Sequence, residues 1–151
     1  VMIRKTDIKL YPYNVWTGVL SDKEEVLRKF DFFTTVYHML ADKPIEVNDL
    51  DFDSTAGITY VVRERKTRDK GSLTLFNEEI TTYNYHHLFN VISHEAGHAA
   101  DIMWQGLIGM NAKDDFDSNN KNEPYIYLLG HIAGIMGSYV MNFNKEQNGI
   151  N

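Results

Sequence analysis

The sequence predicts a single α+β domain, in which a small antiparallel or mixed sheet packs against helices. Several stretches are rich in β-favouring residues, and others repeat apolar residues at helical spacing. The chain has 151 residues, of which 43% are hydrophobic and 13% aromatic, so one hydrophobic core can form. We expect one domain over residues 1–143 and a polar C-terminal tail over residues 144–151.

The first part of the chain is expected to form strand and then a long helix. Residues 6–19 are rich in β-favouring side chains, with an interruption near Pro12. Ser21 and Glu24 have the spacing of a capping box, which indicates the start of a helix. Apolar residues then recur at helical intervals, so a helix is predicted over residues 22–41.

Residues 57–65 and 71–77 are predicted to be two strands joined by a turn, with the helices on one side of the sheet. Basic residues crowd into this turn and its flanks: Arg63, Arg65, Lys66, Arg68 and Lys70. The tract is either a solvated hairpin tip or a docking patch. The formal net charge of −6 argues against general nucleic-acid binding.

The second half is predicted to contain a helix over residues 85–105, a polar loop, and a last helix over residues 123–143. The uncharged stretch from Tyr125 to Phe143 is long enough to span a membrane. Polar residues within it and few basic residues beside it favour a buried core helix, so no membrane insertion is expected. The N-terminus does not resemble a signal peptide, and a cytoplasmic location is expected.

The most informative segment is His94-Glu95-Ala96-Gly97-His98, within the predicted helix over residues 85–105. Two histidines four residues apart share one helix face, so both imidazoles can bind one ion. Glu95 lies about 100° further round the helix, where it can reach a water on that ion. This is the HExxH zinc motif, in which the glutamate is the general base. Because the chain has no cysteine, the metal must be held by histidine and carboxylate.

The two faces of this helix differ in a way that favours a metal site. An apolar stripe is predicted to pack on the sheet: Leu88, Ile92, Ala96, Ala99 and Met103. A polar sector lies away from it: His87, Asn90, His94, His98, Asp101 and Gln105. This sector is either a metal site or only the solvent-exposed face of an amphipathic helix. Exposed faces usually carry Lys, Glu and Arg, so the metal site is favoured.

A catalytic zinc takes three protein ligands and keeps one position for water, so a third ligand is needed. The pattern HExxHxxGxxH fails, because Asp101 and Trp104 stand where its glycine and last histidine should be. Glu123 is the favoured candidate, since it opens the last helix just before Pro124. Its alternative role is a carboxylate that interacts with the helix dipole. Loop carboxylates could compete but are typical of a solvated segment: Asp114, Asp115 and Asp117.

The HEAGH motif, together with the later sequence NEPYIYLLG, resembles the Glu-zincins, zinc metallopeptidases whose third ligand is a glutamate on the next helix. More narrowly, it is similar to small zincin-like proteins of phage and gut-bacterial genomes. The resemblance covers roughly residues 57–140. It implies a zincin-like fold, a Zn²⁺ cofactor, the metal ligands His94, His98 and Glu123, and Glu95 as the base. It also implies that residues 72–77 line the cleft edge, where an extended peptide can pair.

Several further residues have two open interpretations. Large family members carry Asp four residues after the ligand Glu, and this chain has Tyr127 there. Tyr127 is either a catalytic residue that orients a ligand or donates to an oxyanion, or a core aromatic. Asp101 either holds an imidazole through its second nitrogen or is a surface acid. His131 is expected to be a buried core histidine, and the role of His87 is open.

The motif and the resemblance together imply zinc-dependent hydrolysis of peptide bonds in a peptide or protein substrate. Glu95 would take a proton from the attacking water and pass it to the leaving amine. The alternative is a non-catalytic zinc protein, structural or regulatory and phage-related, that retains the fold. Such a site would add a fourth protein ligand, for example His87 or His131. A third interpretation is an interaction module with an incidental HExxH. The sequence defines no substrate specificity.

Overall fold

The computed structural model describes the whole chain except residues 1–2, 9–11, 51, 53–55, 109–122 and 150–151. Its centre is a five-stranded mixed sheet with the order β1-β2-β5-β4-β3. Strands β2 and β5 pair in parallel, and the other neighbours are antiparallel. The strands are β1 (Arg4–Asp7), β2 (Asn14–Val19), β3 (Phe30–Phe33), β4 (Gly57–Glu64) and β5 (Lys70–Phe76). The predicted α+β class with a mixed sheet is therefore confirmed.

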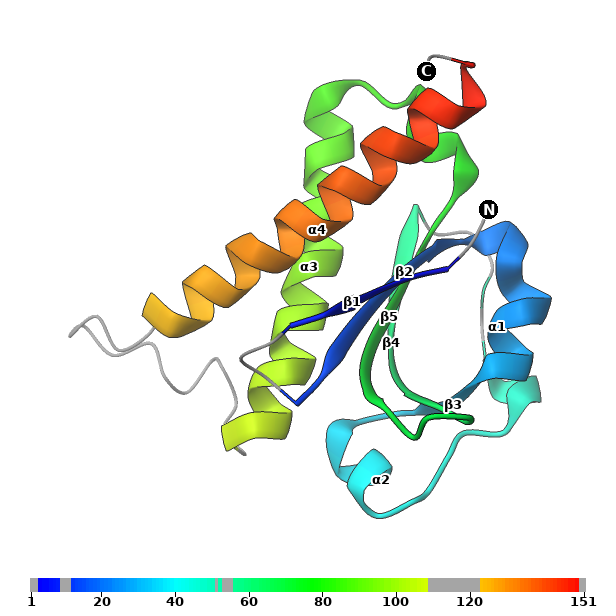
Figure 1. Cartoon of the computed structure of the whole chain (residues 1–151), viewed down its shortest axis with the longest axis vertical. Helices are drawn as coiled ribbons and strands as arrows, with labels where there is room; N and C mark the ends of the chain where they lie inside the picture. The colour runs from blue at the N-terminus through cyan, green and yellow to red at the C-terminus, as the bar shows by residue number, and fades with distance from the viewer. Residues whose placement is uncertain (1–2, 9–11, 51, 53–55, 109–122, 150–151) are drawn as a thin grey trace.

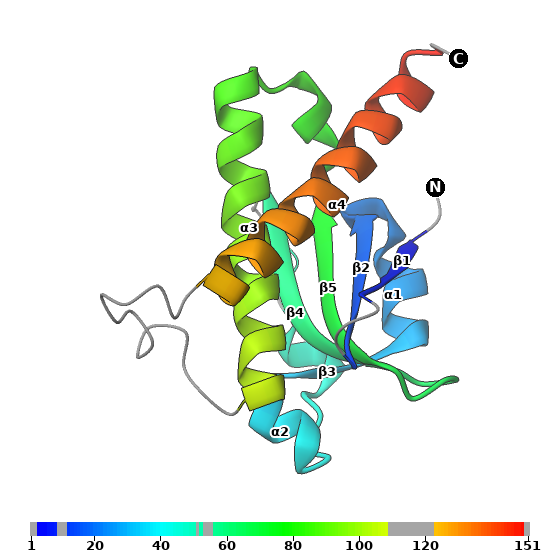
Figure 2. The same ribbon diagram turned by 60° about the vertical axis from the view of Figure 1, so that its left-hand side comes forward.

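Helices cover both faces of this sheet (Figures 1 and 2). They are α1 (Lys23–Lys29), α2 (Val36–Leu40), α3 (Tyr85–Ile108) and α4 (Glu123–Gln147), with 3-10 turns at Leu20–Asp22, Val47–Asp49 and Glu78–Thr82. The long helices α3 and α4 cross one another over one face, and α1 packs on the opposite face. The expectation that helices lie on one side only is therefore wrong.

Alternation along the central strands builds a core on each face of the sheet. On one face, Val15 and Phe76 join the cluster that contains the buried sides of α3 and α4. On the other face, Trp16 and Leu75 pack with Val26 of α1. The site described below lies on the α3 face.

The prediction of one helix over residues 22–41 is wrong, because strand β3 separates α1 from α2 in the middle of this segment. Phe32 and Phe33 belong to the cores on opposite faces of the sheet, which is the alternation of a strand. The apolar spacing that suggested a helix is compatible with this strand too, and pairing with β4 decides the outcome. The predicted capping box is not formed. Helix α1 begins without a side-chain cap bond, and the Ser21 N–H donates to Glu78 Oε1 at 3.0 Å.

The later elements agree closely with the prediction, because their periodic patterns are long. Strands β4 and β5 and the start of α3 lie within one residue of their predicted positions. Helix α4 continues to Gln147, so the tail assigned to residues 144–151 is shorter than predicted. Phe143 is buried in the core, and the Asn148 side-chain amide donates to the Asn144 carbonyl at 2.9 Å. These contacts extend the helix beyond its apolar stretch.

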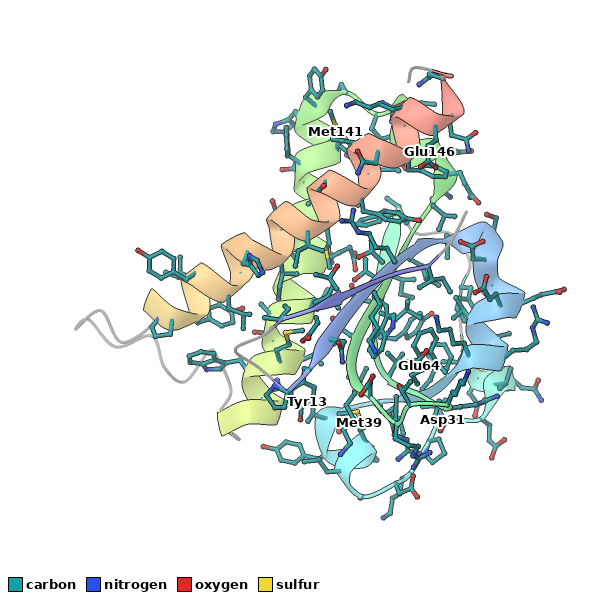
Figure 3. All side chains as sticks on the ribbon, in the orientation of Figure 1. Tyr13, Asp31, Met39, Glu64, Met141 and Glu146 are labelled. Carbon is teal, nitrogen blue, oxygen red and sulfur yellow. The ribbon has the colours of Figure 1, made fainter. Side chains whose placement is uncertain are left out.

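Three of the five basic residues of the β4–β5 hairpin, Arg63, Arg65 and Arg68, form ion pairs within the fold. The buried Arg63 guanidinium donates to Asp31 and Asp42 at 3.2 and 2.6 Å. Arg65 donates to Asp31 at 2.8 Å. Asp31 of β3 is paired with Arg63 in the register of β3 and β4, one residue from the labelled Glu64 at the end of β4 (Figure 3). Much of the positive charge is therefore neutralised locally, which favours a structural role over a docking patch.

Among the described residues, α4 provides the one helix that is long and apolar enough to span a membrane. A third (33%) of its most apolar stretch is buried. One face packs in the core through Leu128, Ile132 and Met136, while Gly130 and Gly134 lie on the exposed face. The expected burial therefore applies to one face of α4. A core helix meets the same criteria of length and composition, so this is weak support for a membrane span.

Candidate metal centre

Helix α3 presents the HExxH residues in the way that the sequence predicts. The apolar stripe is buried at every position: Leu88, Ile92, Ala96, Ala99 and Met103. The polar sector is exposed or half-exposed at every position: His87, Asn90, His94, His98, Asp101 and Gln105. Burial of the stripe therefore fixes the rotation of the helix and turns both motif histidines outward.

The imidazoles of His94 and His98 converge on one point. Their Nε2 atoms are 3.1 Å apart, and the ring centroids are 4.7 Å apart at an interplanar angle of 85°. Two nitrogens bound to one tetrahedral zinc ion at ordinary bond lengths are about 3.3 Å apart. The observed pair therefore fits a shared zinc ion with little movement. Without an ion, the separation suits a hydrogen bond between one protonated and one unprotonated nitrogen.

Glu95 lies between this pair and the sheet. Its side chain is buried, with the residue only 4% exposed, whereas the side chain of His94 is 69% exposed. The Thr59 hydroxyl donates to Glu95 Oε2 at 2.7 Å, and the hydroxyls of Thr59 and Thr74 are 2.8 Å apart. The other carboxylate oxygen, Oε1, lies 4.0 Å from His94 Nε2. One oxygen of Glu95 is thus anchored to strand β4 while the other faces the histidines.

Gly57 gives Glu95 the room to lie against the sheet. A Cβ atom at this position would lie 2.9 Å from Glu95 Cγ and 3.2 Å from Phe76 Cδ1. Such contacts are too short for any larger residue, so helix and strand approach this closely only with glycine there. Sequence reasoning missed Gly57, Thr59 and Thr74. Small or hydroxylic residues on the helix-facing side of two predicted strands were the available signal.

Asp101, one turn beyond His98, bonds to helix α4 rather than to an imidazole in the part of the chain that is described. It accepts a hydrogen bond from the Tyr125 hydroxyl at 2.9 Å. The Tyr125 ring also contacts Trp104, with centroids 5.6 Å apart. Burial and the bond to Asp101 raise the pKa of Tyr125 above its ordinary value. Tyr125 is therefore the aromatic residue that joins the start of α4 to the turn of α3 next to the site.

Tyr127 points to solvent, with 75% of the residue exposed, so its interpretation as a core aromatic is wrong. Glu123 is the first residue of α4, and its side chain lies outside the described residues. The other acidic candidates, Asp114, Asp115 and Asp117, lie outside the described residues.

The remaining histidines lie away from the pair. His131 is exposed, which corrects the expectation of a buried core histidine, and it lines a pocket to which Arg4 of β1 also contributes. The His87 ring contacts Tyr83, with centroids 4.4 Å apart. Among the described side chains, no group of three or more His, Asp or Glu residues could hold an ion. Within that set, neither His87 nor His131 supplies the fourth ligand that a structural zinc site would use.

A cleft of about 400 Å³ opens beside His98. Helix α3 forms one wall, strand β4 another, and the segment from the end of β3 to the start of α2 the third. The expectation that residues 72–77 form the cleft edge is wrong, because β5 is paired on both sides, with β2 and β4. The last β3 partner of β4 is Phe33, opposite Val61. Residues 57–59 of β4 extend beyond this point, and no other described strand pairs with them on the side away from β5.

No protein-family model, no curated protein and no solved structure matches this chain. Its candidate function therefore rests on the chemistry of the site. The arrangement brings together two imidazole nitrogens suited to one ion, a buried carboxylate with one oxygen facing them, and an adjoining cleft. These are some of the parts needed to activate a water next to a bound substrate, and the third metal ligand is not among the described side chains.

Proposed function

We propose that the protein is a zinc-dependent hydrolase of peptide bonds with a zincin-like active site. His94 and His98 are two of the metal ligands, and Glu95 is the general base. The observation that carries this proposal is the 3.1 Å separation of the two Nε2 atoms, together with the Glu95 oxygen Oε1 that faces them. Glu123 is proposed as the third ligand. Its support is the Tyr125–Asp101 bond, which brings the first turn of α4 close to the turn of α3 that follows His98.

Each residue of the site has its own role in the proposed hydrolysis. Zinc held by these ligands would supply a Lewis acid for the substrate carbonyl and lower the pKa of water to about 7. Glu95 Oε1 accepts the proton of the attacking water, because Oε2 is already engaged by Thr59. The same oxygen then gives the proton to the leaving amine. The hydrogen bonds that link the hydroxyls of Thr74 and Thr59 to the Glu95 carboxylate keep it in one orientation through both proton transfers.

The edge of β4 suits an extended substrate. The Glu64 N–H donates to the Asp69 carbonyl across the hairpin, so odd-numbered residues of β4 direct their backbone groups away from β5. Strand β3 pairs with β4 as far as Val61. Beyond it, the backbone groups of Gly57 and Thr59 are placed to pair with an added strand. The substrate is therefore an extended peptide segment rather than a folded surface.

Removal and return of zinc tests the proposed function. Protein treated with a chelator is expected to lose hydrolysis of a mixed peptide library, measured by mass spectrometry, and to regain it with one equivalent of zinc. Hydrolysis that persists after complete removal of metal would contradict the role of zinc. Stoichiometric zinc with no cleavage in the library would instead favour the non-catalytic zinc protein.

Thr59→Val is expected to lower kcat by about tenfold to a hundredfold, because it removes a hydrogen bond to a charged group. Zinc affinity should stay unchanged, since Thr59 contacts no metal ligand in this proposal. Thr59→Ser should restore the rate. Thr17→Val is the matched control, because Thr17 is a buried threonine of β2 with no hydrogen bond from its hydroxyl among the described residues. An equal loss of kcat in both variants would show that Thr59 acts only through the fold.

A further inference from the structure

The cleft beside His98 has the position of a substrate side-chain subsite. It follows the histidine-bearing face of α3, where His98, Asp101 and Gln105 succeed one another on consecutive turns. Its opposite wall includes Thr59 and Val61 of β4. A peptide that pairs with residues 57–59 would thus direct alternate side chains toward this cleft. Its volume of about 400 Å³ lies within the usual range for ligand pockets.

Apart from the zinc ion proposed on His98, Asp101 carries the one formal charge among the described residues that line the cleft. Asp101 is the only acidic residue among its described lining residues, and no Lys or Arg lines it. The half-buried Asp101 accepts a bond from the Tyr125 hydroxyl, which is a neutral donor and leaves the negative charge uncompensated. No Lys or Arg among the described residues forms an ion pair with Asp101. A half-buried carboxylate of this kind favours a cationic partner.

The rest of the cleft suits the stem of a long side chain. Its apolar lining comes from β3, α2, the segment after α2, β4 and α3: Phe33, Val36, Ile45, Val61 and Ile102. Lysine and arginine carry an apolar stem that packs on such surfaces and a charged end that needs an anionic partner. A purely apolar side chain would bury Asp101 without compensating its charge, which costs free energy.

From this arrangement we propose that the cleft is a specificity subsite for a basic residue, lysine or arginine, of the bound peptide. Asp101 determines this preference, and Tyr125 holds its carboxylate in place. The inference rests on the proposed function for the identity of the substrate as a peptide. It assigns a substrate class to that function and a role to Asp101 that does not involve the metal.

The preference of the cleft for a basic side chain is measured by ligand binding, so the result does not depend on whether the protein hydrolyses peptides. The full zinc-loaded chain is titrated with N-acetyl-lysine methylamide and with N-acetyl-norleucine methylamide, which lacks the ammonium group, and shifts of the Val61 and Ile102 methyl NMR signals are followed. We expect the lysine compound to bind about five- to tenfold more tightly. Asp101→Asn should abolish this difference. Tyr125→Phe should weaken this difference without abolishing it, because the charge remains but the hydroxyl no longer holds the carboxylate in place.

Glu146→Gln is the matched control, because it removes one negative charge near the far end of α4 (Figure 3). It should leave the lysine preference unchanged. Equal binding of both compounds to the unmodified protein, binding of neither, or a preference that survives Asp101→Asn would each overturn the subsite. A chain that binds lysine selectively but cleaves no peptide would instead leave the subsite in place and contradict the proposed hydrolysis.

Discussion

Replacement of Glu95 by glutamine is expected to remove peptide hydrolysis while zinc stays bound with unchanged stoichiometry. The loss should be about a hundredfold to ten-thousandfold, the contribution typical of a general base. Glutamine has nearly the same volume as glutamate. This matters because the side chain at position 95 packs closely against Gly57. Its amide oxygen can still accept the bond from Thr59. The measured quantities are kcat on a cleaved library peptide and zinc content by mass spectrometry.

The control for this variant is Glu79→Gln, because Glu79 is an exposed glutamate in the turn before α3. It should retain full activity. Two results would contradict the assignment of Glu95 as the base. One is a Glu95→Gln protein with the original rate, and the other is a Glu95→Gln protein that has lost its metal, which would make the carboxylate a ligand.

Single replacement of His94 or His98 by alanine is expected to weaken zinc binding on the order of a hundredfold or more, since each removes one of few ligands. Both residues are exposed, so the free energy of unfolding without zinc should change by no more than about 0.5 kcal/mol. Competition with a chromophoric chelator measures the affinity, and thermal unfolding of the metal-free protein measures stability. Glu123→Gln should weaken zinc binding similarly if Glu123 is the third ligand.

His86→Ala is the matched control for these variants. His86 is an exposed histidine of the same helix, and its ring bonds to Asn90 rather than to the pair. It should bind zinc like the unmodified protein. Unchanged zinc affinity in His98→Ala would mean that the close approach of the two rings is only a hydrogen bond between them.

The elements that sequence patterns predict best are the ones whose periodicity is long. Helix α3 shows its apolar stripe over several turns, and its rotation, which turns His94 and His98 outward, follows from that stripe alone. Strand β3 has four residues, too few for its alternation to be distinguished from a helical pattern. Only its register against β4, which is distant in sequence, makes it a strand.

The surroundings of Glu95 could not be predicted because they depend on strand pairing. Thr59 and Thr74 lie directly opposite each other in the antiparallel register of β4 and β5, and that register brings both hydroxyls beneath α3. The requirement for glycine at position 57 follows from the distance between helix and sheet. The two tyrosines at the start of α4, Tyr125 and Tyr127, could not be distinguished for a similar reason. Which of Tyr125 and Tyr127 faces α3 depends on how the helix packs, and the structure places Tyr125 there.

The central claim is that the imidazoles of His94 and His98 hold one zinc ion beside Glu95. Anomalous scattering at the zinc absorption edge, from crystals of the zinc-loaded chain, tests it most directly. We expect a single strong peak about 2.0–2.1 Å from both Nε2 atoms, with the Glu123 carboxylate as the third protein ligand and an open position for water. A map with no peak between the two rings, or with zinc bound elsewhere on the chain, would contradict the claim.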